Sequence, residues 1–249
     1  MKKVFVYLLG IMVFFAVACS SEKTGDTETA AADSTGTDVA VAPTNFWEGE
    51  VSDVVYGEAG TPAEAEAAVT YTVDAASSSV AWYGEKAAYG HNGTIDVQEG
   101  RFEVVDGKVV GGFFIIDMTT IKDLDIDDAE KNGKLVGHLS SDDFFNVEMY
   151  PSASLVITKA ASLEGSTYMV SGNLTIRDKT QQVTFPATID VADDGVTAEA
   201  TFAIDRSKFD VKYNSGTLIV DLAADQVISD DIAFNIQLVA SPSEAAQAE

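Results

Sequence analysis

The chain has 249 residues, with 40 acidic and 15 basic side chains and a formal net charge of −25. This charge argues against a nucleic-acid partner, because binding to phosphates requires a basic surface. Cys19 is the only cysteine. The fold therefore has no internal disulfide and must be stabilised by apolar burial and backbone hydrogen bonds.

The amino terminus has the pattern of an export signal. Lys2 and Lys3 precede an apolar run from Val4 to Val17, which is too short to span a bilayer and ends in small residues. Cys19 follows directly and resembles the lipobox cysteine of bacterial lipoproteins. We therefore expect residues 1–18 to be a signal peptide and Cys19 to carry acyl chains. The alternative is an ordinary cleaved signal with a free thiol.

Residues 19–68 are rich in Ala, Thr, Ser, Asp, Glu and Gly, so they bury too little apolar surface to offset their ordering entropy. The sequence predicts a lipidated, flexible tether there, a folded domain over 69–240 and a disordered tail over 241–249. The tether is interrupted by the apolar clusters 45–47 and 54–56, and whether they dock on the domain stays open at this point.

From Val69 onward the apolar residues recur with a period of two, which predicts strands. The alternation is clearest over 168–177, 182–189, 196–204 and 231–238. Asp106-Gly107 predicts a hairpin between 102–105 and 108–118. Pro186 within a strand indicates an edge position or a bulge. The spacing of strands and turns is typical of an antiparallel meander.

The segment 121–146 breaks this pattern. Ser140 or Ser141 precedes two aspartates, and such a hydroxyl caps the start of a helix whose positive end the acids favour. We expect a short helix near 141–146 and a second one near 126–132.

Each strand has one apolar face, and no long amphipathic helix is present to cover it. Two sheets must therefore form a sandwich, or one sheet must close into a barrel of about eight strands. Several inward positions are small, namely Gly112, Gly172, Ala187, Ala198 and Ala200. They are consistent with an unfilled cavity, and equally with tight packing against bulky neighbours.

Six segments in the same order resemble the YceI-like family of exported, lipocalin-like barrels. They are Trp82 to Gly93, Glu99-Gly100 with Gly111 to Ile121, His138 to Asn146, Tyr150-Pro151, Gly172 to Ile176, and Arg206 to Phe209. The family often has glycine where this chain has Asp178 and Asp210, in turns that need positive φ.

The resemblance implies an all-β, antiparallel, closed or nearly closed barrel with one or two short helices. It also implies an apolar interior that binds a long isoprenoid or similar lipid without chemistry. The candidate lining residues are apolar and inward-facing: Phe114, Ile116, Leu155, Ile157, Val170, Leu174, Phe185, Phe202, Ile204, Phe234 and Ile236. Each is also expected in a filled core. Trp82, His91 and Arg206 are candidates for the cavity rim.

Other chemistry finds little support in the sequence. His91 and His138 lie far apart without metal-site spacing, so we expect each to cap a loop or bond a backbone carbonyl, and we predict no metal and no cofactor. Asp123-x-Asp125-x-Asp127 begins like a calcium loop, but Asp128 and Lys134 stand where glycine and glutamate are needed. Ser140 and Ser141 near His138 lack the surroundings of a nucleophile, so we predict that the protein is not an enzyme.

The leading prediction is thus a lipid-anchored binding protein of the bacterial cell envelope, without a nucleic-acid partner. We expect it at the outer membrane, facing the periplasm or the surface. It would hold an isoprenoid, a quinone or a fatty-acid derivative for sequestration or transport. The alternatives are an interaction module with a filled core and an acidic surface, and a hydrolase that uses His138. A homodimer is also compatible with the sequence.

Overall fold

Strands dominate the folded part of the chain. The computed structural model describes residues 45–62, 68–87 and 89–243, so the expected signal peptide, Cys19 and most of the expected tether and tail lie outside the described residues. The strands are β1 (Ser52–Asp53), β2 (Val55–Gly57), β3 (Val69–Val73), β4 (Ser79–Lys86), β5 (Tyr89–Val105), β6 (Lys108–Asp123), β7 (Ser152–Ser162), β8 (Thr167–Ile176), β9 (Lys179–Ala192), β10 (Gly195–Asp205) and β11 (Ile228–Pro242).

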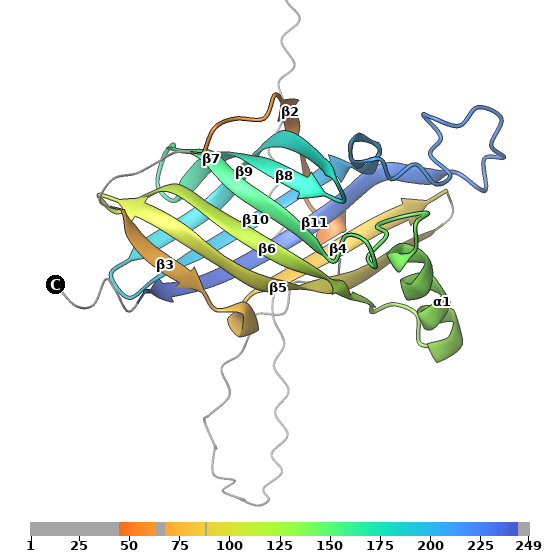
Figure 1. Cartoon of the computed structure of the whole chain (residues 1–249), viewed down its shortest axis with the longest axis horizontal. Helices are drawn as coiled ribbons and strands as arrows, with labels where there is room; N and C mark the ends of the chain where they lie inside the picture. The colour runs from red at the N-terminus through yellow and green to blue at the C-terminus, as the bar shows by residue number, and fades with distance from the viewer. Residues whose placement is uncertain (1–44, 63–67, 88, 244–249) are drawn as a thin grey trace, which may run out of the picture. The chain divides into compact units, whose positions relative to one another are not determined.

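These strands form one sheet that closes on itself (Figure 1). From β5 to β11 each strand pairs antiparallel with the next one in the sequence. β3 and β4 then connect β11 back to β5 and close the sheet. These two share one place in the barrel, since each pairs with both β11 and β5. The result is an eight-place antiparallel barrel, which confirms the predicted fold class.

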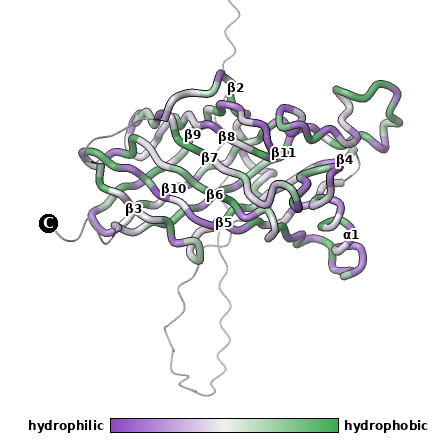
Figure 2. Tube along the Cα trace, viewed as in Figure 1, coloured by the Kyte–Doolittle hydropathy of each residue, from purple (hydrophilic) through white to green (hydrophobic). Residues whose placement is uncertain are grey.

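Alternation along the strands explains why the sheet closes. Apolar and polar residues alternate along the chain trace (Figure 2), and successive side chains of a strand point to opposite faces. Closure puts the larger apolar face of the strands on the inside. The Asp106-Gly107 hairpin is present as predicted, with φ of 51° and 69°. Two positive φ values define the turn type whose twist matches that of the flanking strands.

The helix is longer than predicted and starts elsewhere. α1 spans Ala129–Ser140, and its N-cap is Asp128, whose side chain accepts from the backbone N–H of Lys131. Ser141 is the C-cap, so the predicted helix near 141–146 is wrong, and turns occupy that segment. The prediction near 126–132 located only the first turn. Three short 3₁₀ helices, Phe46–Glu48, Ala75–Ser77 and Arg206–Phe209, complete the described part.

The folded domain begins earlier than Val69. β9 and β10 pair only at one end, where Thr188 to Ala192 lie opposite Gly195 to Glu199. Beyond this point the strands part, and the segment 52–57 fills the gap. β1 runs parallel to β10, and β2 runs antiparallel to β9.

Two aromatic contacts hold this amino-terminal segment. The backbone N–H of Asp205 donates to the Tyr56 hydroxyl at 2.6 Å. The Trp47 ring stacks on Tyr83 with centroids 4.4 Å apart. The sheet therefore includes β1 and β2, which precede the predicted boundary at residue 68. It also extends past the predicted end at 240, since Ser241 and Pro242 pair with β3.

Two turn predictions have definite outcomes. Pro186 lies between the part of β9 that pairs with β10 and the part that pairs with β2, which confirms an edge-like position. Asp210 has a φ of 63°, as expected where the family often has glycine. In the neighbouring turn the positive φ falls on Arg177 rather than on Asp178.

No helix of the described residues is long and apolar enough to cross a bilayer.

Candidate functional site

The barrel contains an apolar cavity of about 500 Å³. This volume lies within the usual range of small-molecule sites. All eleven residues predicted to line a cavity are on its wall: Phe114, Ile116, Leu155, Ile157, Val170, Leu174, Phe185, Phe202, Ile204, Phe234 and Ile236. Their inward positions are as the alternation indicated. Contact with a ligand stays a prediction for each of them.

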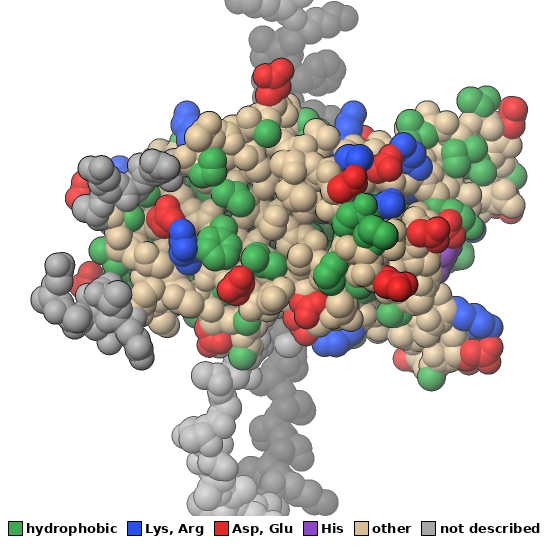
Figure 3. Space-filling model, viewed as in Figure 1, with side chains coloured by type: hydrophobic (Ala, Val, Ile, Leu, Met, Phe, Trp, Pro, Cys, Tyr) green, Lys and Arg blue, Asp and Glu red, His purple; other side chains and the backbone are tan. Residues whose placement is uncertain are grey.

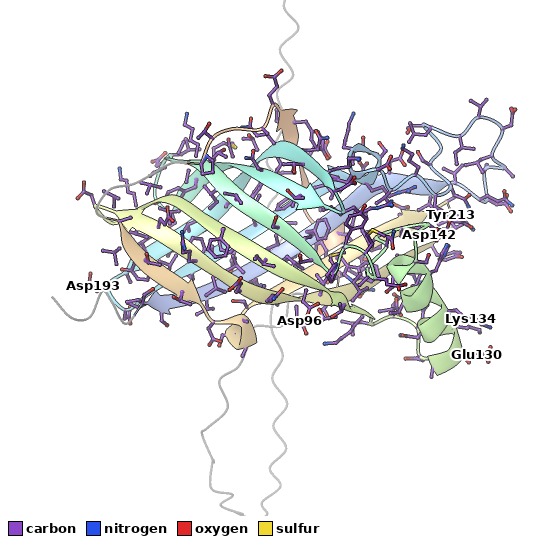
Figure 4. The ribbon with its side chains drawn as sticks, viewed as in Figure 1. Asp96, Glu130, Lys134, Asp142, Asp193 and Tyr213 are labelled. Atoms are coloured by element: carbon purple, nitrogen blue, oxygen red, sulfur yellow. The ribbon has the colours of Figure 1, made fainter. Side chains whose placement is uncertain are left out.

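One end of the barrel is filled. Side chains near the β5–β6 and β9–β10 turns are buried without lining the cavity: Tyr71, Val73, Val104, Val109, Tyr168, Val196 and Ala240. Asp193 marks this end in Figure 4. The cavity is therefore closed on this side.

The opposite end carries the mouth. Its wall includes residues of the β4–β5 turn, α1 and the loop before β11, among them the exposed Glu85 and Tyr89 together with Leu135 and Tyr213. Tyr213 and Asp142 are labelled at this end in Figure 4. Because three of the four exposed lining residues, Glu85, Tyr89 and Tyr213, lie here, a ligand has its widest access at the α1 end.

An aromatic cluster narrows this mouth. The ring centroid of His138 lies 4.7 Å from that of Tyr213 and 5.0 Å from that of Phe144. Nε2 of His138 lies 3.1 Å from a carboxylate oxygen of Asp143. Sequence reasoning missed Tyr213 and the α1 residues, since neither segment has strand periodicity. The Phe144-Phe145 pair was the one available signal.

The three residues proposed for the rim have different roles. Trp82 is 9% exposed and donates from Nε1 to the carbonyl of Thr94 at 3.3 Å, so it is part of the wall. His91 is half-buried and lies on the wall near the mouth. Arg206 also lies on the wall but has no free polar group to offer a ligand.

Arg206 is 1% exposed. Its guanidinium donates to the carbonyls of Ser229, Val211 and Ile228 at 2.9, 2.9 and 3.1 Å, and lies 3.2 Å from Asp230. Burial lowers its pKa, and the carboxylate of Asp230 opposes that shift. With its donors committed to the backbone, Arg206 holds β11 and the preceding loop in place. Arg206 therefore lies in the wall, and contact with a ligand stays a prediction for it as well.

The small residues divide into two groups. Ala187, Ala198 and Ala200 line the cavity, and their short side chains leave it open. Gly112 and Gly172 do not line it. A Cβ at Gly112, which has a φ of 151°, would lie 2.4 Å from the carbonyl oxygen of Arg101. These glycines therefore permit close strand approach, and only the alanines enlarge the cavity.

A shallow depression lies outside the barrel where β9 and β10 part. It is formed by Pro186, Thr188, Thr201 and Asn235 among others, and it shares Ala187, Glu199 and Ala200 with the cavity wall. The wall is therefore thin at this point, and the small side chains of the two alanines separate cavity from solvent.

His91 of β5 lies in a cluster of polar side chains beside the end of β6. Its Nδ1 lies 3.0 Å from Oδ2 of Asp125 and 4.0 Å from Oδ2 of Asp123. Burial, together with the neighbouring Asp125 carboxyl, raises the pKa of Asp123. Burial also acts on Asp125, but hydrogen bonds from Asn92 and His91 outweigh it and lower the pKa of that carboxyl. Both histidines thus bond carboxylates, so the predicted carbonyl partners are wrong.

The serines near His138 are engaged elsewhere. The Ser140 hydroxyl donates to the carbonyl of Val136 at 2.9 Å, and the Ser141 hydroxyl donates to the carbonyl of His138 at 2.7 Å. Neither hydroxyl contacts an imidazole nitrogen. The arrangement that a nucleophilic serine needs is therefore not formed by these residues.

Comparison with known proteins identifies the family. The model of the YceI-like domain matches residues 71–240, which is more than half of the chain. The chain belongs to the YceI-like domain family. A search of curated proteins found no significant match.

Two solved structures share the YceI-like fold of this chain. BcnA of Burkholderia cenocepacia is 24% identical, with a TM-score of 0.54 over 68% of this chain and 99% of that one. A polyisoprenoid-binding domain from Saccharophagus degradans, implicated in plant cell wall breakdown, is 14% identical, with a TM-score of 0.52 over 70% of this chain and 99% of that one. At these identities the likeness establishes the fold.

Proposed function

We propose that this YceI-like protein holds a long apolar ligand, namely an isoprenoid, a quinone or a fatty-acid derivative, in its barrel for sequestration or transport in the cell envelope. The observation that carries the proposal is the cavity of about 500 Å³ with an apolar wall. Water finds few hydrogen-bond partners in such a space, whereas an apolar chain gains about 0.8 kcal/mol of binding free energy per buried methylene. A solved structure of the same fold is a polyisoprenoid-binding domain, which is consistent with this class of ligand.

The geometry also suggests how the ligand lies. The apolar chain would extend towards the filled end, and any polar group would remain at the mouth near His91 and Tyr89. Apolar walls select weakly between chains that differ by one methylene, so the depth of the cavity would set the preferred length. Loading would occur through the α1 end, where most of the exposed lining residues lie.

We further propose that acyl chains on Cys19 anchor the protein in a bacterial membrane, most simply the outer membrane. The amino-terminal signal pattern supports this. The net charge of −25 would repel anionic headgroups, so the acyl chains would supply the attachment. Mass spectrometry of the mature amino terminus tests this part by itself. An unmodified Cys19 or cleavage at another position would refute it and leave the cavity proposal intact.

Two adjacent isoleucines of β6 test the binding proposal. Ile116 lines the cavity, whereas Ile115 points to the outer face of the same strand. We expect Ile116→Glu to weaken octaprenol binding at least a hundredfold, because the carboxylate would be buried without a partner or would draw water into the cavity. Ile115→Glu is the matched control and should bind like the parent protein. Emission from Trp82, which lies on the cavity wall, reports uptake.

The competing interpretation is a protein-interaction module with a filled core and an acidic surface. On the face seen in Figure 3, acidic and basic side chains are interspersed. If the parent protein takes up no isoprenoid, quinone or fatty acid, or if both glutamate variants bind equally well, the cavity is not a binding site. The search would then move to the acidic surface.

A further inference from the structure

Three potential metal ligands meet beside the cavity mouth. His91 lies on β5, Asp123 is the last residue of β6, and Asp125 follows two residues later. Each offers one ligand atom, and these atoms lie within 4.8 Å of one another. We propose that His91, Asp123 and Asp125 bind a divalent metal ion of the zinc class. This site shares His91 with the wall of the proposed lipid cavity, but its test requires no bound lipid. It revises the expectation from sequence spacing that no metal is bound.

The surroundings of the Asp123 carboxyl favour a bound cation. Its side chain is 0% exposed. Oδ1 accepts from the backbone N–H of Ile126 and from Nδ2 of Asn132, each at 3.0 Å. Oδ2 is buried and has no hydrogen-bond partner among the described residues. A buried carboxylate oxygen without a partner is costly, and a cation at this atom would remove that cost.

The charge balance points the same way. Two carboxylates converge here, and no lysine or arginine of the described residues forms an ion pair with Asp123 or Asp125. The nearest basic group is the imidazole of His91, with Nδ1 3.0 Å from Asp125 and 4.0 Å from Asp123. A divalent cation between the three groups would neutralise both carboxylates.

The donor set selects the kind of metal. One imidazole nitrogen and two carboxylate oxygens suit zinc and its neighbours, which accept such sets in tetrahedral geometry with one position left for water or substrate. Calcium requires six to eight oxygen ligands, and the imidazole does not suit it.

A second set of contacts already orients these ligands. Asn132 of α1 donates to Oδ1 and to the main-chain carbonyl of Asp123. The backbone N–H of Asn92 donates to Oδ1 of Asp125 at 2.9 Å, which leaves Oδ2 free to face His91. The Tyr89 ring packs edge-on against the imidazole with centroids 5.3 Å apart. Supporting contacts of this kind are typical of metal ligands.

Calorimetric titration of the full chain with Zn²⁺, after treatment with a chelator, tests the site. We expect one Zn²⁺ per chain. Removing a ligand by His91→Ala or Asp123→Asn should weaken binding more than a hundredfold, and Asn132→Ala should weaken it ten- to a hundredfold. Loading with Co²⁺ should give a visible absorption band that disappears in His91→Ala.

His138→Ala is the matched control, because His138 also lies beside one carboxylate but has no third ligand. Its titration should resemble that of the parent protein. Circular dichroism would show whether each variant retains its strands, and His91→Ala serves if Asp123→Asn does not fold. The proposal is overturned if the parent protein binds no stoichiometric Zn²⁺. It is also overturned if His91→Ala and His138→Ala weaken Zn²⁺ binding equally, because the metal would then lie at scattered surface groups. A parent protein in which Asp123 and Asp125 share a proton and bind no Zn²⁺ would overturn it as well.

Discussion

A phenylalanine placed inside the barrel separates an open cavity from a filled core. Ala198 of β10 lines the cavity and is 8% exposed. The ring of Ala198→Phe would enter the cavity and take the room of about four methylenes of a bound chain, or about 3 kcal/mol of burial. We therefore expect the affinity for octaprenol to fall roughly a hundredfold.

The same substitution should stabilise the protein in the absence of ligand. A ring that enters empty apolar space gains about 1–2 kcal/mol in the free energy of unfolding, because it is removed from water without displacing its neighbours. In a filled core the same ring costs about 1–3 kcal/mol through strain. The sign of the change therefore distinguishes the two interpretations.

Urea unfolding and octaprenol binding are the two assays. Thr197→Phe is the control, since Thr197 is the preceding residue, is exposed and does not line the cavity. It should leave binding unchanged and stability within about 0.5 kcal/mol. A lower urea midpoint for Ala198→Phe, together with undiminished binding, would refute the account of the cavity.

Further substitutions test how the barrel is held together, each by urea unfolding. Burial raises the pKa of Tyr56 to about 12, so the unfolded chain ionises first and stability should fall between about pH 10 and 12. Tyr56→Phe should lack this alkaline loss and cost about 1–2 kcal/mol at neutral pH, because the N–H of Asp205 loses its acceptor; equal pH profiles would contradict this. Gly93→Ala should cost about 1–3 kcal/mol, since a Cβ there lies 1.8 Å from a carbonyl oxygen, whereas Gly84→Ala meets nothing within 4 Å and should be neutral. Arg206→Met should cost about 3–5 kcal/mol by stranding a buried carboxylate, and a neutral outcome would show that its ion pair is dispensable.

The barrel was predictable because its determinants are local. A period of two places alternate residues on opposite faces of a strand whatever its neighbours are, so β8 to β11 were visible in the sequence. Asp106-Gly107 likewise specifies its own turn. The inward positions of Phe114 and Ile116 follow from the same alternation. Whether an inward face encloses empty space depends on how facing strands meet, and this required the structure.

The errors fall where tertiary contacts decide. β1 and β2 are too short to be stable alone, and they form because β9 and β10 part and leave unpaired backbone groups. The helix start was misplaced because Asp128 and Ser141 both offer a capping group before polar residues, and only the packed chain distinguishes N-cap from C-cap.

The metal site was hidden by strand irregularities. Regular pairing outward from the Asp106-Gly107 turn would place Gly93 opposite Thr120. Bulges between β5 and β6 shift the register, so that Gly93 pairs with Asp123. This shift brings Asp123 and Asp125 beside His91, which is 34 positions away from Asp125 in the sequence.

The most direct test of the central claim is native mass spectrometry of a chain that begins at Ser20, which lacks Cys19 and retains β1 and β2. The protein should be purified without detergent, and bound material should then be extracted into organic solvent. We predict a polyprenyl, quinone or acyl species at about one per chain. A ligand-free mass that does not change when octaprenol, quinone and fatty acid are added would contradict the proposed lipid-binding function.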